Sequence, residues 1–334
     1  MIRIRNSAPR LPAGVSTFRE KPLAVDTDTR CLLCGGPTAG VLSAVFDNRF
    51  GAPGTCAIVR CADCEQLQTA PRLTEAELAG TYETYYNYGS GATAYARFRE
   101  RLVRSWLYRL WLAIDGDITF QTVKGAGRLL DVGCNEGRGL EQFRRNGFDA
   151  EGQEINHKAA DMARARGFAV ATEPLSRLRA DHAFDVVVLS NVLEHASDPR
   201  AMLTDVARLL RRGGEVWITL PNARSVWRGV FGRQWINWHV PYHITHFDIG
   251  TLGRLLGQSG FAVATARNET PALWIAQSVI AALFARPGRP CRQMRSIFIV
   301  APLIAAVRLL MFPVLWWFNR RGRGDALVVH ARKA

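Results

Sequence analysis

Four cysteines occur in two closely spaced pairs near the start of the chain. Cys31 and Cys34 form one C-x-x-C pair, and Cys61 and Cys64 form the other. Four thiolates in this arrangement suit a tetrahedral Zn²⁺ ion that has no open position. A redox-active pair would instead lie at the start of a helix in a strand–helix–strand unit. The sequence around these two pairs does not indicate such a unit. We therefore expect a structural zinc ion here, with Cys56 as a spare thiol that could replace one ligand.

A glycine-containing turn follows a short apolar run in the middle of the chain. It has the sequence Asp131-Val132-Gly133-Cys134-Asn135-Glu136-Gly137. Glycines at a strand-to-helix turn let the backbone approach a ligand closely, although a tight turn alone explains them too. A nicotinamide cofactor is disfavoured, because its G-x-G-x-x-G pattern requires a glycine where this chain has Asn135. Asparagine tolerates positive φ, so the turn can still form.

Glu154 ends the next expected strand, where a carboxylate can accept hydrogen bonds from both ribose hydroxyls of a nucleoside. A solvated surface glutamate is the alternative interpretation. Together with the glycine turn, this residue favours a site for an adenosyl ligand.

Histidines supply the candidate general bases, since their pKa lies near neutral pH. His195 follows the fourth expected strand of the main domain, at the edge where open α/β sheets bind ligands. It could instead hold the start of the helix that begins at Asp198. His243 and His246 lie in an aromatic-rich loop after the fifth strand, which suits a substrate wall. Metal binding by His239, His243 and His246 is an alternative that lacks a partner carboxylate in the same loop.

Short Val- and Leu-rich runs alternate with helical stretches in the second half of the chain, which predicts a mostly parallel sheet covered on both faces. The expected strands cover residues 128–133, 148–153, 168–172, 184–190, 215–221, 261–266 and 325–332. Helices are expected over 75–115, the second of them over 92–114. The helix that starts at Pro199 is expected to stop at Gly213-Gly214.

Four motifs in order, LLDVGCNEG, FDAEGQEIN, FDVVVLSNVLEHASDP and LLRRGGEVWITLPN, resemble those of class I S-adenosylmethionine-dependent methyltransferases. The resemblance covers most of residues 126–270. It implies an α/β fold with a Rossmann-like seven-stranded, mostly parallel sheet, S-adenosyl-L-methionine as cofactor, and methyl transfer as the reaction. The cofactor-binding residues that it implies are Asp131, Gly133, Cys134, Asn135, Gly137, Glu154, Ile155, Ser190, Asn191 and Val192.

Three shorter stretches resemble other methyltransferases and imply what kind of molecule accepts the methyl group. The pair Glu194-His195 is similar to one in ubiquinone-type O-methyltransferases, and the stretch from Pro241 to Phe247 is similar to one in bacterial methyltransferases of sugars and surface polysaccharide. A zinc ribbon followed by Tyr82-x-x-Tyr85-Tyr86 resembles deoxysugar methyltransferases, in which this module covers the sugar. These resemblances imply a small-molecule or glycan acceptor, such as a sugar or lipid-linked sugar hydroxyl, with His195, His243 or His246 in catalysis.

The net charge of +14 also fits nucleic acid or anionic lipid as a partner. An RNA or protein methyltransferase is therefore one alternative, and a catalytically silent zinc- and nucleoside-binding scaffold is another. Residues 31–64 contain no basic cluster interleaved with aromatics, which disfavours a nucleic-acid-reading ribbon. The basic first residues contain no apolar run typical of a signal peptide, so we expect a cytoplasmic protein.

Two apolar arms, residues 272–284 and 296–318, interrupt the sheet pattern before the last strand, and arginines flank them. Such helices suit insertion into one leaflet of an anionic membrane, on the inner face of the plasma membrane. An ordinary pair of packing helices or a dimer interface is the alternative. We divide the chain into a flexible leader (1–25), a zinc ribbon (26–72), a helical lid (73–116) and a methyltransferase domain (117–334) that carries 272–320 as an insertion.

Overall fold

The computed structural model describes residues 29–85, 101 and 105–334. The expected flexible leader, residues 1–25, lies outside the described residues, as does most of the helix expected over 92–114. The end of that helix is present as α3 (Trp106–Asp115). An earlier helix, α1 (Glu75–Tyr85), follows the cysteine-containing segment.

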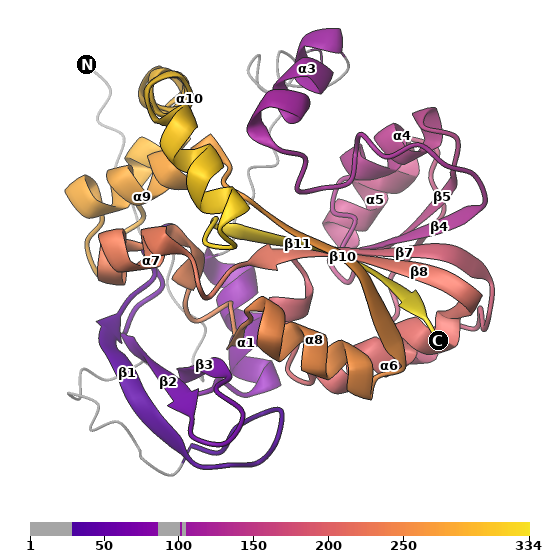
Figure 1. Cartoon of the computed structure of the whole chain (residues 1–334), viewed down its shortest axis with the longest axis horizontal. Helices are drawn as coiled ribbons and strands as arrows, with labels where there is room; N and C mark the ends of the chain where they lie inside the picture. The colour runs from indigo at the N-terminus through magenta and orange to yellow at the C-terminus, as the bar shows by residue number, and fades with distance from the viewer. Residues whose placement is uncertain (1–28, 86–100, 102–104) are drawn as a thin grey trace, which may run out of the picture.

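A seven-stranded sheet forms the centre of the molecule (Figure 1). Strands β4 to β8 run parallel, and the last strand, β11, runs antiparallel to both of its neighbours, β8 and β10. This architecture confirms the predicted Rossmann-like fold. Across the sheet the strands are β10 (Phe261–Glu269), β11 (Ala326–Lys333), β8 (Leu210–Pro221), β7 (Phe184–Ser190), β4 (Arg128–Val132), β5 (Asp149–Gln153) and β6 (Val170–Ala171).

Helices cover both faces of this sheet, as predicted. Helices α4 (Arg138–Arg145) and α5 (His157–Ala165) lie on one face, and α6 (Pro199–Leu209) and α8 (Ile249–Gln258) lie on the other (Figure 1). Each pair contributes apolar side chains to its own buried cluster against the strands. The cofactor-side loops therefore rest on a core that is packed from above and below.

Helix α6 begins as predicted but ends early. The side chain of Asp198 accepts a hydrogen bond from the N–H of Ala201, and Pro199 occupies the first helical position. The prediction that the helix continues to Gly213-Gly214 was wrong. The helix stops at Leu209 because the next residue, Leu210, already pairs with Phe184 of β7 and opens β8.

A second, smaller sheet contains the cysteine pairs. It is built from β1 (Thr38–Val45), β2 (Cys56–Cys61), β3 (Leu67–Ala70) and β9 (Thr245–His246), in that order and all antiparallel. Its fourth strand comes from the histidine-containing loop, about 180 residues later in the sequence. The ribbon is thus joined to the main domain by a shared sheet.

The apolar insertion forms two helices between β10 and β11. Helix α9 (Ala272–Phe284) buries one side against the domain, whereas α10 (Ile297–Arg320) buries only Val307 and Leu315. Two prolines, Pro302 and Pro313, lie within α10. A short helix, α7 (Val226–Phe231), follows β8. Five 3₁₀ turns complete the described elements: η1 (Leu175–Arg177), η2 (Leu193–His195), η3 (Gly232–Gln234), η4 (Ile236–Trp238) and η5 (Arg292–Arg295).

Candidate active site

The predicted cofactor loop connects the end of β4 to the start of α4. Gly133 and Gly137 both have positive φ, at 68° and 77°, as the turn requires. A Cβ on Gly133 would lie 2.9 Å from Val192 Cγ2, and a Cβ on Gly137 would lie 2.8 Å from Ala163 Cβ. Asn135, which lies between these two glycines, has a φ of 49°. The loop therefore depends on glycine at two positions and on asparagine's tolerance of positive φ at a third.

Glu154 lies directly against this loop. One carboxylate oxygen accepts a hydrogen bond from the N–H of Asn135 at 3.0 Å, and the other accepts from the N–H of Asn156 at 2.8 Å. Asn156 in turn caps the start of α5. The next residue after Glu154, Ile155, is largely exposed. An acidic group and an apolar side chain are thus presented side by side at the mouth of the loop.

Asp131 is the buried acidic residue of the loop region. Its carboxylate lies against the first turn of α4, where a Cβ on Gly139 would be 2.9 Å from the Asp131 Oδ2 atom. Burial raises the pKa of Asp131 to about 7, and the negative charge of Glu154 adds to the increase. The group is therefore poised to be ionised when a positive charge comes near it.

The remaining cofactor residues lie at the ends of neighbouring strands. Ser190 ends β7, and the N–H of Asn191, which has a φ of 55°, donates to the carbonyl of Thr219 at 2.7 Å. The side chain of Val192 reaches Gly133. Cys134 is buried, and its thiol lies against Gly152 of β5 and near the carbonyl of Asn135 in the loop. The structure therefore brings all the predicted cofactor residues together at the carboxyl ends of β4, β5 and β7.

Two of the predicted catalytic histidines lie in contact with each other. The ring centroids of His195, in η2, and His243 are 4.6 Å apart, with the rings edge to face. The Nδ1 of His195 lies 3.0 Å from the carbonyl oxygen of Tyr242, and that of His243 lies 2.9 Å from the carbonyl oxygen of Asn237. Because a carbonyl oxygen only accepts, each Nδ1 carries the hydrogen, and each Nε2 keeps its lone pair.

Glu194 is a site residue that sequence reasoning named only as the neighbour of His195. Its side chain is 1% exposed, and neither carboxylate oxygen has a hydrogen-bond partner on another described residue. One of its oxygens lies 3.9 Å from the Nε2 of His243. Burial raises the pKa of Glu194 to about 8 and lowers that of His195 to about 4. The histidine loop itself contains no partner carboxylate, but the tertiary fold brings Glu194 to it from η2.

Aromatic rings surround this pair of histidines. The hydroxyl of Tyr82, on α1, lies 2.8 Å from the Nδ1 of His195, and the Tyr82 ring packs on Tyr242 with centroids 5.0 Å apart. Phe50, from the ribbon, packs against Tyr242 and His239 at 5.9 and 5.7 Å. The ribbon and α1 thus both reach the predicted acceptor side.

His246, the third predicted catalytic histidine, has a different environment. Its Nε2 donates to the hydroxyl of Thr69 at 3.0 Å, and that hydroxyl donates to the carbonyl of His243 at 2.6 Å. Burial lowers the pKa of His246 to about 3, helped by the positive charge of Arg228. These contacts connect β9 to β3, which favours a structural role for His246 in holding the ribbon on the domain.

Comparison with known proteins identifies the domain. A family model described as a methyltransferase domain matches residues 95–266, just over half of the chain. The chain belongs to this methyltransferase family. The predicted membership of the class I S-adenosylmethionine methyltransferases is thereby confirmed for family and fold.

Several relatives of the methyltransferase are ubiquinone biosynthesis O-methyltransferases. Those of Pectobacterium carotovorum and Cronobacter sakazakii are 29% and 30% identical over 124 residues. The match covers 34% of this chain and 52% and 51% of theirs, so the chain spans about half the length of these relatives. A solved structure of a methyltransferase from Burkholderia thailandensis, bound to 1,6-didemethyltoxoflavin and S-adenosylhomocysteine, is 15% identical with a TM-score of 0.43. That match covers 82% of this chain and 97% of the other.

The four cysteines of the methyltransferase's ribbon form a compact cluster. The sulfur atoms of Cys31 and Cys64 are 3.5 Å apart, and those of Cys34 and Cys61 are 3.4 Å apart. All four lie within 4.8 Å of one another, and none forms a disulfide. The donor set of four thiols on two turns fits tetrahedral Zn²⁺. Cys56 is buried at the start of β2 and is not part of this cluster.

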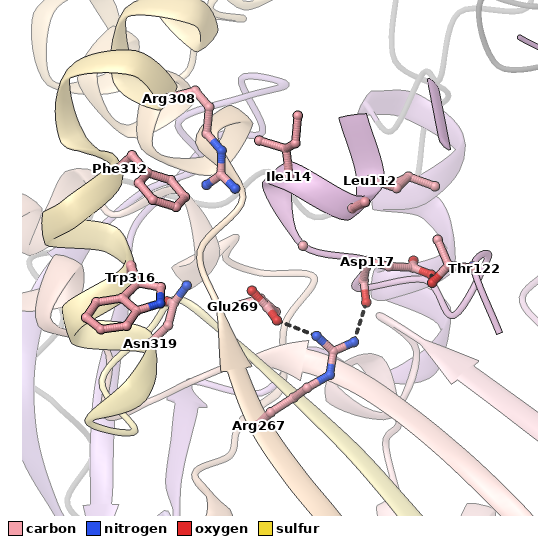
Figure 2. Close-up of a pocket in the computed structure, with 12 residues that line it drawn as sticks. Leu112, Ile114, Asp117, Thr122, Arg267, Glu269, Arg308, Phe312, Trp316 and Asn319 are labelled. Atoms are coloured by element: carbon pink, nitrogen blue, oxygen red, sulfur yellow. Dashed lines mark hydrogen bonds and ion pairs between the residues drawn. The ribbon is translucent and has the colours of Figure 1, made fainter. Parts of the chain in front are cut away.

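A cavity of about 410 Å³ lies between α3, α10 and the end of β10 (Figure 2). Its charged residues are paired within the protein. Arg267 lies between Glu269 and the carbonyl of Asp117, and Arg308 lies 3.5 Å from the carboxylate of Asp115. The apolar part of the lining consists of Leu112, Ala113, Ile114, Phe312 and Trp316. None of the predicted site residues lines this cavity.

Proposed function

We propose that the protein transfers a methyl group from S-adenosylmethionine to a hydroxyl of a sugar or a lipid-linked sugar. The observation that carries the proposal is the contact between the Glu154 carboxylate and the N–H of Asn135 in the glycine loop. Glu154 would bind the ribose hydroxyls, and Asp131 would bind the methionine ammonium group. Ile155 and Val192 would pack on the adenosyl part, and Ser190 and Asn191 would lie along the cofactor.

The reaction itself is an in-line displacement at an activated carbon. The bond from sulfur to the methyl carbon breaks, a bond from carbon to the acceptor oxygen forms, and the hydroxyl loses its proton. The protein therefore has to position the hydroxyl and accept this proton. The lone pair on the Nε2 of His195 or His243 is suited to accept it, because Nδ1 of each ring is held as a donor by a backbone carbonyl.

The surroundings of these histidines support a polyhydroxyl acceptor. Glu194, His195 and His243 offer hydrogen-bond acceptors, and sugar hydroxyls are donors. The partly exposed rings of Phe50 and Tyr82 supply apolar faces of the kind that line small-molecule sites, and both pack on the fully buried Tyr242. The ribbon would complete this wall, and a structural Zn²⁺ on its four cysteines would hold the wall in place.

The exposed apolar surface of helix α10 supports the proposal that the protein is associated with a membrane, at its cytoplasmic surface. Its most apolar 18 residues have a mean hydropathy of 2.4, and among the described helices it alone is long and apolar enough to cross a membrane. Only 6% of those residues are buried. Leu309 and Leu310 are 79% and 80% exposed. At its end, the guanidinium groups of Arg320 and Arg321 stack on Trp316 and Trp317. Apolar side chains followed by tryptophan and arginine suit the boundary between acyl chains and phosphates.

A methyl-label experiment tests the proposed reaction. The zinc-loaded chain is incubated with deuteromethyl S-adenosylmethionine and with extracts of cells that lack the protein, and mass spectrometry locates the label. We expect label in a sugar or lipid-linked sugar, and a loss of about 100-fold or more in His195→Ala or His243→Ala. His182→Ala, at an exposed histidine outside the site, is the matched control. Label in RNA or protein, or in no fraction at all, would contradict the proposal.

A further inference from the structure

Glu194, His195 and His243 come together although they lie on two segments about 48 residues apart in the sequence. Each offers one ligand atom, and the three atoms lie within 4.8 Å of one another. Glu194 and His195 are held by the turn η2, and His243 is held by the loop before β9. The N–H of Ile244 donates to the backbone carbonyl of Glu194 at 2.8 Å, which fixes the two segments to each other.

Both imidazoles use Nδ1 to donate to the backbone, which leaves each Nε2 available as a metal ligand. Each Nδ1–H donates to a backbone carbonyl, that of Tyr242 for His195 and that of Asn237 for His243. Metal-binding histidines usually donate their other ring N–H to a carbonyl or carboxylate in this way, because the hydrogen bond fixes the tautomer and the ring orientation. The two rings are therefore already in the form that binds a metal ion.

Glu194 provides an independent indication of a missing positive partner. Its carboxylate is almost fully buried, and neither oxygen is hydrogen-bonded to another described residue. Among the described residues, no arginine or lysine lies within ion-pair distance of it, and the imidazole of His243 is 3.9 Å away. A buried carboxylate without partners is costly, and a bound cation would offset that cost.

We propose that Glu194, His195 and His243 bind a divalent transition-metal ion, of the manganese-to-zinc series, at a second metal site separate from the cysteine cluster. Two imidazoles and one carboxylate are a common ligand set for such ions, and three protein ligands leave coordination positions open. The open positions would take oxygen atoms of the acceptor, a step that rests on the proposed function. In the metal-bound form the ion would lower the pKa of a bound hydroxyl, which would replace the role of the two histidines as bases. His246 does not join the site, since its Nε2 donates to Thr69.

Titration with Mn²⁺ tests this site on the intact chain loaded with only one equivalent of Zn²⁺, which the four-cysteine cluster retains and which leaves the second site free. Mn²⁺ prefers nitrogen and oxygen ligands, so it should leave the four cysteines occupied by zinc. Electron paramagnetic resonance and calorimetry should register one equivalent of bound Mn²⁺ per chain. Glu194→Gln and His243→Asn should each weaken Mn²⁺ binding at least tenfold, whereas His182→Asn should leave it unchanged.

The zinc content of each variant reports whether the variant has folded. The titration of the wild-type chain tests the site by itself, even if a variant fails to fold. Absence of Mn²⁺ binding to the wild-type chain, or unchanged binding in a folded Glu194→Gln, would overturn the cation site. Methyl transfer that persists without Mn²⁺ binding would leave the proposed function standing with the histidines free as bases. Mn²⁺ binding in a chain that does not bind S-adenosylhomocysteine would leave the cation site standing and reject the proposed function.

Discussion

The side chains of the site are positioned by contacts between residues that lie at very different separations in the sequence. Glu154 and Asn135 belong to consecutive strand–turn units, so their meeting follows from the fold class and could be anticipated from the sequence. Glu194 and His243 meet because the loop after β8 folds back onto η2. No periodicity or spacing in the sequence encodes that contact, and so the carboxylate near His243 was missed.

The pH dependence of cofactor binding should report the ionisation of Asp131. Burial raises the pKa of this carboxyl to about 7, so it is mostly protonated below that pH and ionised above it. Only the ionised form attracts the methionine ammonium group. The dissociation constant for S-adenosylmethionine should fall by more than about tenfold from about pH 5.5 to about pH 7. Calorimetry checks this, and in Asp131→Asn the pH step should disappear. A step of the same size in the variant would argue against this role.

Replacing Gly137 with alanine should destabilise the protein more than replacing Gly167 does, although both glycines have positive φ. In Gly167→Ala the new methyl group meets nothing within 4 Å, so only the backbone strain remains, at about 1–2 kcal/mol. In Gly137→Ala the methyl group also meets Ala163 Cβ at 2.8 Å. The free energy of unfolding should therefore fall by roughly 2–4 kcal/mol. Urea denaturation of both variants measures the difference, and equal losses would show that the loop does not pack as described.

Among the elements, most strands of the main sheet were predictable because they are short Val- and Leu-rich runs between turns. The two-residue strand β9 was not, because so short a segment carries no alternation and pairs with β3 far away in the sequence. The same limit explains the extended start of β8, where Arg211 to Gly214 are polar or small and resemble a turn. Pairing with a neighbouring strand, not local preference, determines both segments.

Loss of a cysteine ligand should affect the ribbon and leave the cofactor loop intact. Cys64→Ser should remove most of the bound zinc and make the ribbon sensitive to proteolysis, since thiolate binding supplies its folding free energy. Affinity for S-adenosylhomocysteine should stay within about twofold, because the glycine loop belongs to the other sheet. Cys56→Ser is the matched control, as this buried thiol is outside the cluster. Zinc retained in Cys64→Ser, or lost in Cys56→Ser, would contradict the assignment of ligands.

For the whole molecule, the sequence predicted the class of fold and the presence of an apolar insertion, but not where the insertion would sit. Helix α10 lies beside α9 at one end of the sheet and leaves most of its surface uncovered (Figure 1). Composition cannot distinguish a buried helix from an exposed one, because both are apolar all round. The exposed surface becomes visible only once the neighbours of the helix are known.

Membrane association should depend on the exposed side of α10. The double variant Leu309→Ser/Leu310→Ser removes two exposed leucines, whose burial is worth about 1.5–3 kcal/mol each. Binding to vesicles that contain anionic lipid should fall by at least about tenfold in a sedimentation assay. Val41→Ser, at an exposed apolar residue of β1, should bind as the wild type does. If the wild type ignores vesicles and light scattering shows a dimer that the double variant loses, α10 is a protein interface.

Calorimetry with S-adenosylhomocysteine is the most direct measurement of the central claim, that the glycine loop and Glu154 together bind an adenosyl ligand. The intact, zinc-loaded chain should bind one equivalent, and Glu154→Ala should lose at least about tenfold in affinity because two ribose hydrogen bonds to a charged acceptor are removed. Glu151→Ala, in the same strand and paired with Arg128, should bind normally. No heat from the wild-type chain, or equal affinity in Glu154→Ala, would contradict the account.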